Sequence, residues 1–158
     1  MNRRPRHLRA IPSSPVAPAV ELVLGGEPLQ LVPERQFSVT FVRAERRWHF
    51  QRLNVWLWFR VLALDPADAP YDGIDLPLVC ATKEGRLGQL SKFARLWARV
   101  AGRRPLKGER LSTGILAGKL FTIRTRTVRT DHEQRPHGAL GEYSVIADVS
   151  SIDVGGPA

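Results

Sequence analysis

Hydrophobic and polar residues alternate along two neighbouring stretches of this chain. Residues 37–50 begin with apolar side chains in phase with Phe37, but Trp48 falls on the opposite face, so the pattern changes parity around residues 43–46. A period of two is typical of a half-buried β-strand, and a β-bulge would produce the change of face. Residues 52–64 alternate as well, and the short connection predicts an antiparallel pair.

Three more strands and one helix are predicted further along. Residues 74–80 predict a short strand that Pro77 favours at a sheet edge, after a turn-rich loop at residues 65–73. Residues 119–130 form a long alternating pattern with arginines on one face, and residues 142–152 predict its return strand. A segment before residue 119 has room for one helical turn.

The helix is predicted over residues 87–102. Its apolar positions recur at the helical spacing and include Phe93 and Trp97, and Gly102 is suited to end it. The opposite side carries Lys92, Arg95 and Arg99.

The order β-β-β-α-β-β, with one main helix, predicts a mostly β fold. We expect a small antiparallel β-barrel of the OB-like kind, or a strongly bent sheet. The single β-rich domain is predicted over residues 36–153. Residues 1–35 hold six of the twelve prolines and several arginines, and predict a basic, flexible arm. Such an arm assists nucleic-acid binding in many proteins, but a solubilising tail or a misplaced start site would explain it equally well.

The excess of positive charge indicates what kind of partner the protein binds, and it says little about the fold. The formal net charge is +9, and Arg greatly outnumbers Lys. An excess of this kind favours nucleic acid or an anionic membrane surface, and arginine favours phosphate and bases. The sequence lacks an apolar run of transmembrane length. Cys80 is the sole cysteine, which predicts a buried, small apolar side chain in a reducing, cytoplasmic protein.

The sequence names no reaction. His132 and His137 flank Pro136 in a polar loop, a poor metal site, and the phosphate-binding glycine-rich loop of nucleotide hydrolases is absent. The aspartates of residues 65–75 suit turn capping better than acid–base chemistry. We therefore predict no cofactor, no metal and no enzymatic activity, with a hydrolase or nuclease whose carboxylates meet only in the fold as the weakest alternative.

The basic residues are the stronger signal. If they converge, they would follow a phosphate backbone, and aromatic side chains beside them would stack on bases. In the stretch NVWLWFRVLAL, one face of the strand holds Trp56, Trp58 and Arg60, and we expect the apolar stripe of the helix to cover at least one tryptophan. The predicted nucleic-acid-binding residues are Arg43, Arg46, Arg47, Trp58, Arg60, Lys92, Arg95, Arg99, Arg103, Arg104, Lys107, Arg124, Arg126 and Arg129.

Several short motifs also carry a resemblance. The predicted helix is followed by a basic loop and then by two short motifs. A Leu-x-Gly-Lys motif begins the long strand and consists of Leu116, Gly118 and Lys119. A Tyr-Ser-x-Ile motif lies in the return strand and consists of Tyr143, Ser144 and Ile146. Together with WLWFRVL they resemble short proteins encoded by phages and integrative elements, over about residues 46–152. Some of those proteins look like OB-type single-stranded DNA-binding proteins. This chain departs from bacterial single-strand-binding proteins by ending in SSIDVGGPA instead of an acidic tail.

The sequence therefore predicts a nucleic-acid-binding accessory protein of a phage or mobile element, with single-stranded DNA favoured over RNA. The alternative is an adaptor or inhibitor that docks its basic surface on an acidic protein of the nucleic-acid machinery. Self-association is compatible with either prediction.

Overall fold

The computed structural model describes residues 19–22, 29–49, 52–83, 86–131, 133–136 and 138–153. It confirms a mostly β fold with one main helix. The principal elements are β1 (Gln36–His49), β2 (Arg52–Val61), β3 (Asp75–Ala81), α1 (Lys92–Ala101), β4 (Leu120–Val128) and β5 (Tyr143–Asp153). A single 3-10 turn at Thr113–Leu116 confirms the predicted turn before β4.

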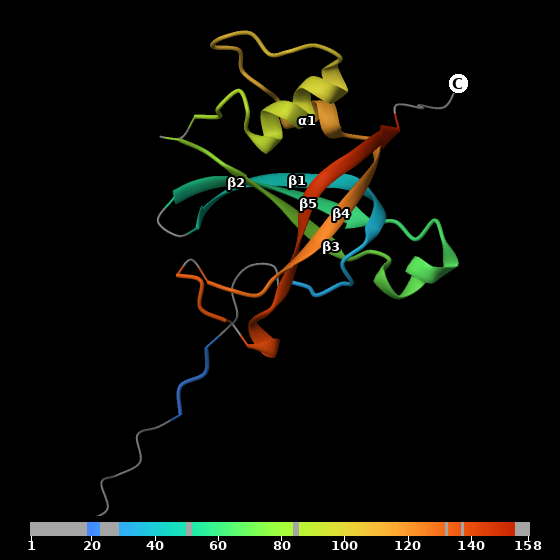
Figure 1. The fold of residues 1–158 in the computed structure, drawn as a ribbon, viewed down its shortest axis with the longest axis vertical. Helices are drawn as coiled ribbons and strands as arrows, with labels where there is room; N and C mark the ends of the chain where they lie inside the picture. Colours follow the sequence, from blue (N-terminus) through green and yellow to red (C-terminus); the bar gives the residue numbers. More distant parts are fainter. Residues whose placement is uncertain are drawn as a thin grey trace, which may run out of the picture.

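The five strands form one antiparallel sheet in the order β3-β2-β1-β4-β5. The edge position predicted for the Pro77 strand is confirmed. The sheet bends so far that its edge strands, β3 and β5, have Cα atoms within 8 Å of each other (Figure 1). Within the described ranges no hydrogen-bonded ladder joins these edges, so the sheet is not closed into a barrel.

A bulge in β1 allows this bend. Residues 36–40 of β1 pair with β4 and residues 39–49 pair with β2, and the register with β2 shifts between Phe41 and Arg43. The parity change predicted from the sequence is therefore real, although it lies just before residues 43–46. Before the bulge Phe41 faces Phe59 on the core side; after it, Arg43 and Glu45 stand opposite Trp58 and Trp56 on the outer side.

Helix α1 closes one end of the core. Phe93, Leu96 and Trp97 pack with the inner side chains of all five strands in one buried cluster. The helix begins five residues later than predicted, because the Ser91 side chain accepts a hydrogen bond from the Ala94 amide at 3.1 Å and so caps it. Gly102 ends it in the left-handed conformation, with a φ of 71°.

The segment before β1 corrects the predicted domain boundary. Residues 30–35 belong to the folded domain: Val32 is 3% exposed within the core cluster, and Ser144 of β5 donates its amide to Gln30 O at 2.8 Å. The Thr125 hydroxyl donates to Pro33 O at 2.7 Å. This strap, residues 29–35, lies at the end of the sheet opposite α1 (Figure 1). The predicted arm's residues 1–18 and 23–28 lie outside the described residues.

We expect Val32→Ala to lower the free energy of unfolding by about 1.5–3 kcal/mol, because the side chain is fully buried. The neighbouring Leu31 is 54% exposed, so Leu31→Ala is the matched control and should leave stability nearly unchanged. Urea denaturation of both variants measures the difference. Equal effects would contradict the placement of the strap in the core.

Burial also lowers the reactivity that we expect of Cys80, the one cysteine of the sequence. Desolvation raises the pKa of the Cys80 thiol to about 12, and alkylation requires the thiolate. At about pH 8 we therefore expect iodoacetamide to modify Cys80 rapidly only in denaturant, with added glutathione as an internal control for reagent activity. Fast modification of the native protein, followed by mass spectrometry, would contradict the burial.

Candidate nucleic-acid interface

The two tryptophans of β2 lie side by side on its outer face, with ring centroids 5.8 Å apart. Side chains from β1 cover them. The guanidinium carbon of Arg43 lies 4.8 Å from the ring centroid of Trp58, and that of Arg47 lies 4.6 Å from Trp56. Glu45 stands between them, accepting a hydrogen bond from Trp58 Nε1 at 3.0 Å and facing Arg47 at 3.6 Å. The result is a closed layer of cations on aromatic rings.

This layer corrects the role predicted for Trp58. Its side chain is 1% exposed, so it offers no face to a base, and that assignment is wrong for this structure. The expectation that at least one tryptophan is buried is confirmed for both. The expected cover is wrong, however, because the core cluster that holds Phe93 and Trp97 of α1 does not include them. Arg43 and Arg47 therefore act first as packing partners.

Several other predicted arginines are already engaged. Asp75 accepts two hydrogen bonds from Arg60, at 2.8 and 3.0 Å. Arg129 pairs with Glu34 at 3.0 Å. Arg103 pairs with Glu109 and lies 4.8 Å from the centroid of the Trp97 ring. These carboxylates reduce the positive potential that the three arginines offer to a phosphate.

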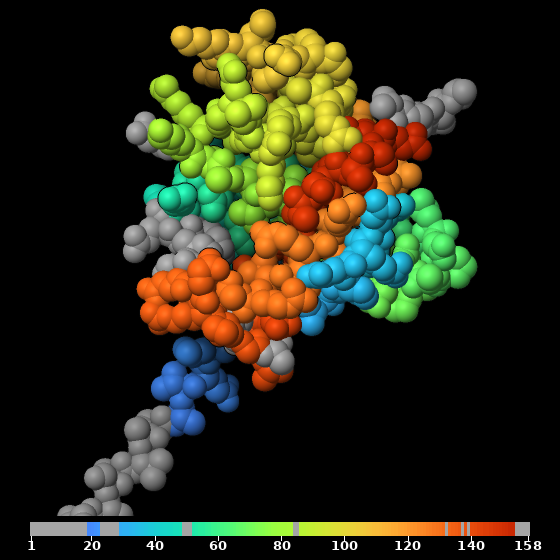
Figure 2. Space-filling model, in the orientation of Figure 1, coloured from blue at the N-terminus to red at the C-terminus, as the bar shows by residue number. Residues whose placement is uncertain are grey.

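A second group of cations has no such partners. Lys92 and Arg95 project from α1, and Arg124 and Arg126 from the outer face of β4; within the described part of the chain, none of their side chains forms a hydrogen bond or ion pair. Arg124 lies in register with Asp148 of β5. We call these four cations and Asp148 the β4–α1 cluster. Figure 2 shows α1, in yellow, directly against β5, in red.

The pKa of Lys92 indicates how closely this cluster is packed. Desolvation is the largest cause that lowers the pKa of its ammonium, and the charges of Arg126 and Arg95 lower it further. The nearby Asp148 carboxylate acts in the opposite direction. Lys92 and Arg95 of α1 and Arg126 of β4 are thus close enough for their like charges to repel one another.

The remaining predicted cations lie elsewhere. Arg99 binds the backbone of β5, donating to Val149 O and, at 3.0 Å, to Ser150 O. Arg104 and Lys107 are exposed in the loop beyond the C-terminal end of α1, and Arg46 is exposed on β1 opposite Val55.

Two aromatic residues that were not predicted as site residues are better placed than Trp58. Trp48, near the end of β1, is 73% exposed and adjoins Arg47 in sequence. Tyr143 begins β5; burial raises the pKa of its hydroxyl, and the charges of Arg126 and Arg47 act in the opposite direction. Trp48 stands opposite Leu53, on the other face of the sheet from Trp56 and Trp58, and its place near the end of the predicted strand is the signal that could have identified it.

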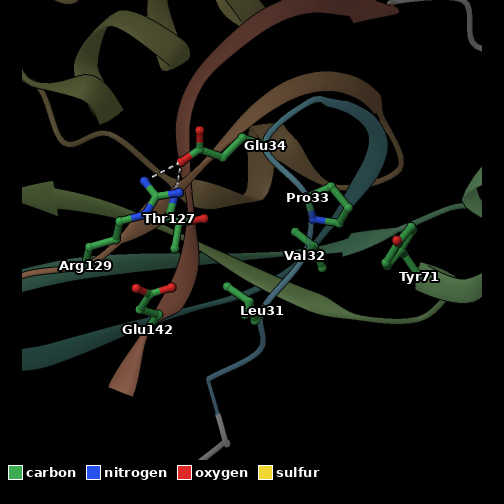
Figure 3. Close-up of a pocket in the computed structure, with 8 residues that line it drawn as sticks. All are labelled: Leu31, Val32, Pro33, Glu34, Tyr71, Thr127, Arg129 and Glu142. Atoms are coloured by element: carbon green, nitrogen blue, oxygen red, sulfur yellow. Dashed lines mark hydrogen bonds and ion pairs between the residues drawn. The ribbon is translucent and has the colours of Figure 1, made fainter. Parts of the chain in front are cut away.

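A hollow of about 530 Å³ beside the strap is a poor phosphate site (Figure 3). Glu34 and Glu142 both line it, and Arg129 is its one basic residue. Glu34 accepts a hydrogen bond from the Thr127 amide at 2.9 Å, which is the largest cause lowering its pKa, followed by Arg129. Two carboxylates against one paired cation would repel an anion.

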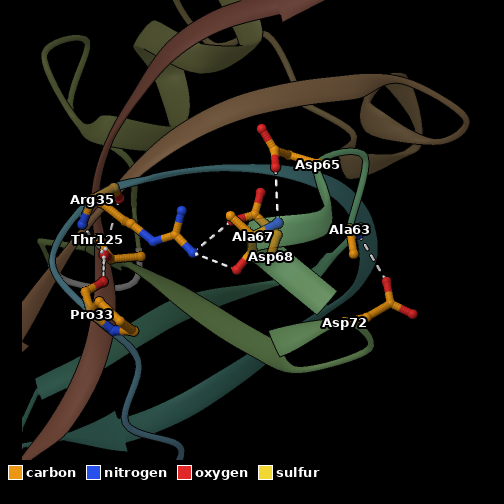
Figure 4. A network of polar contacts seen from close by, with 8 residues as sticks. All are labelled: Pro33, Arg35, Ala63, Asp65, Ala67, Asp68, Asp72 and Thr125. Atoms are coloured by element: carbon orange, nitrogen blue, oxygen red, sulfur yellow. Dashed lines mark hydrogen bonds and ion pairs between the residues drawn. The ribbon is translucent and has the colours of Figure 1, made fainter. Parts of the chain in front are cut away.

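The aspartates that follow β2 serve the loop itself (Figure 4). Asp65 accepts from the Ala67 amide and Asp72 from the Ala63 amide, each at 2.8 Å, which confirms the predicted capping role. Arg35 of the strap pairs with Asp68 at 2.7 Å. These contacts hold the loop against the strap.

Among the described residues, His, Cys, Asp and Glu side chains nowhere gather in a group of three that could hold a metal ion. His132 and His137 lie outside those residues. No helix in the described ranges has the length and apolar character needed to cross a bilayer.

Substitution of a buried and of an exposed tryptophan should affect the stability of the protein differently. We expect Trp58→Ala to lower the free energy of unfolding by about 3–5 kcal/mol, because it leaves a large cavity under Arg43. Trp48→Ala should change the melting temperature little, because that ring is exposed. Thermal denaturation of both variants checks this. A greater loss for Trp48→Ala would contradict the assignment of Trp58 to the buried layer.

Comparison with known proteins leaves the function to be argued from this geometry. No family model, no curated protein and no solved structure matches the chain. The chemistry of the β4–α1 cluster is therefore the basis on which a function is assigned.

Proposed function

We propose that this protein binds single-stranded nucleic acid through the β4–α1 cluster. The observation that carries the proposal is the set of four cations from two elements, without hydrogen-bonded or ion-paired partners in the described chain, around one carboxylate. Such a surface attracts the phosphate backbone whatever its sequence. The cations over Trp56 and Trp58 contribute less, since they are held by the rings and by Glu45.

Exposed aromatic rings favour single strands over duplexes. Bases of a single strand are free to stack on a protein ring, and each stacked base contributes about 1–3 kcal/mol. Trp48 and Tyr143 are the rings that would serve, because Trp48 is exposed and the charge of Arg126 acts on Tyr143. Base stacking and phosphate contacts would then act on neighbouring nucleotides.

An OB-like architecture is part of the proposal. Its support is a strongly bent sheet of five antiparallel strands, with β1 shared between β2 and β4 and the edges β3 and β5 close together. OB-folds are five-stranded, partly open barrels that bind oligonucleotides. The helix between β3 and β4 packs against the core at one end. Here the outer face of β2 is occupied by the tryptophan layer, so binding is assigned to β4, β5 and α1.

The wider role that we propose is that of an accessory protein in the replication or recombination of a phage or mobile element, with DNA favoured over RNA. Its support is the resemblance of the chain's short motifs and its net charge of +9. An acidic protein surface would be the partner if nucleic acid does not bind.

Salt dependence tests the electrostatic contact. For a single strand, the logarithm of the binding constant should fall linearly with the logarithm of salt concentration, with a slope of about −0.7 per phosphate neutralised. With about four contacts, affinity for a labelled oligonucleotide should fall at least tenfold between about 50 and 200 mM salt. The double substitution Arg124→Ala with Arg126→Ala should flatten the slope by about 1.4 and weaken all sequences alike.

The control is Arg60→Ala with Arg129→Ala, which removes the same formal charge from two arginines that are already paired with carboxylates. This control should keep most of the slope. If both double variants flatten it equally, only net charge matters and the cluster is not the site. If the unaltered protein binds neither DNA nor RNA at low salt, the proposed function is rejected.

A further inference from the structure

A pocket of about 190 Å³ lies where α1 crosses β3 and β5. Leu78 and Leu96 are almost fully buried and form its floor. Its rim is basic: Lys92, Arg95 and Arg99 succeed one another along one side of α1. Asp148, between Ala147 and Val149 on β5, is the one carboxylate among its lining residues.

One cation of the rim is held in place by the protein itself. Arg99 is held by two backbone carbonyls of β5, so its charge is fixed at the pocket. Lys92 is half-buried and lies near Arg126, which does not line the pocket but adds its charge. Three cations against one carboxylate leave a local excess that suits a ligand with more than one negative charge.

We infer that this pocket binds a phosphate monoester group, such as the phosphorylated end of a nucleic-acid strand. Arg95 and Lys92 donate to the phosphate oxygens, and Arg99 contributes its fixed charge. Asp148 disfavours the anion and so limits the affinity of the pocket for simple phosphate. For strand ends, this inference rests on the proposed function.

The shape of the pocket selects an end over the middle of a strand. A phosphodiester within a strand carries a single charge and must continue on both sides, whereas a phosphate monoester carries about −1.5 to −2 at pH 7 and needs one opening only. The almost fully buried Leu78 and Leu96 line the side of the pocket toward the core, through which a strand could not continue. The dianion therefore matches both the charge of the pocket and its buried apolar side.

The test compares one short oligonucleotide sequence in three forms, with a 5′-phosphate, a 3′-phosphate or neither, each labelled internally. We expect one phosphorylated form to bind the full-length protein about tenfold more tightly than the unphosphorylated form, as hydrogen bonds to charged groups allow. Inorganic phosphate should compete away this gain and leave the binding of the unphosphorylated strand. The phosphorylated form that gains identifies the strand end; competition without any gain by either end would identify free phosphate as the ligand.

Two substitutions locate the effect. Arg95→Ala should abolish the tenfold gain, whereas Arg104→Ala removes an equally exposed arginine beyond the helix and should retain it. Asp148→Asn should increase the gain, because it removes the one negative charge of the pocket. A loss of folding cannot improve affinity. Asp148→Asn therefore still tests whether the phosphate binds in the pocket if Arg95→Ala proves unstable.

The outcomes separate the two proposals. If the unphosphorylated strand binds with the expected salt slope, and neither end phosphate nor inorganic phosphate has any effect, the pocket inference is overturned while the proposed function stands. A gain that survives Arg95→Ala and ignores Asp148→Asn overturns it as well. If no strand binds, but inorganic phosphate shifts the amide resonances of residues 92–99 in an NMR titration and Asp148→Asn strengthens that shift, the pocket is supported and the proposed function fails.

Discussion

The bulge in β1 is the constraint on which the rest of this structure depends. A strand without it would keep Arg43 and Glu45 on the face that begins with Phe37, and would bury two charged side chains in the core. Because the register shifts after Phe41, these side chains stand over the outer tryptophans instead. β1 is the central strand between β2 and β4, and a bend along it brings the edges β3 and β5 near each other around the core that α1 closes.

Two sets of cations follow from this arrangement, and they differ in what surrounds them. Arg43, Arg47 and Arg60 lie among aromatic rings and carboxylates, where their attraction to a ligand competes with an existing contact. Lys92 and Arg126 lie close enough across the junction of α1 with the sheet for their like charges to repel, and a bound anion would reduce that repulsion as the Asp148 carboxylate does. Within the described residues, the region where α1 meets β4 and β5 thus brings cations from two elements together without a side-chain partner for Lys92 or Arg126.

Periodicity was sufficient to find the strands. The pattern at residues 119–130 became β4 at Leu120–Val128, because each strand buries one face and the alternation records it. The strap could not be found in this way, since its partners Thr125 and Ser144 lie far along the chain and its prolines are typical of a flexible arm. Nor could the sequence separate free arginines from paired ones: Glu34 and Arg129 meet only through the fold. Trp58 was misassigned for the same reason, because the side chains that cover it, Arg43 and Glu45, come from the neighbouring strand β1.

The strap has a consequence for the order of events during synthesis. Gln30 and Val32 are made early, yet they bond to Ser144, which the ribosome adds more than a hundred residues later. The core that holds Val32 therefore cannot be completed while the chain is still short, and these contacts raise the contact order of the domain, which slows folding. Until β5 has been synthesised, the apolar side chains of β1 and β2 lack part of the core that buries them in the folded protein. A nascent chain that pauses before residue 144 is therefore prone to aggregation.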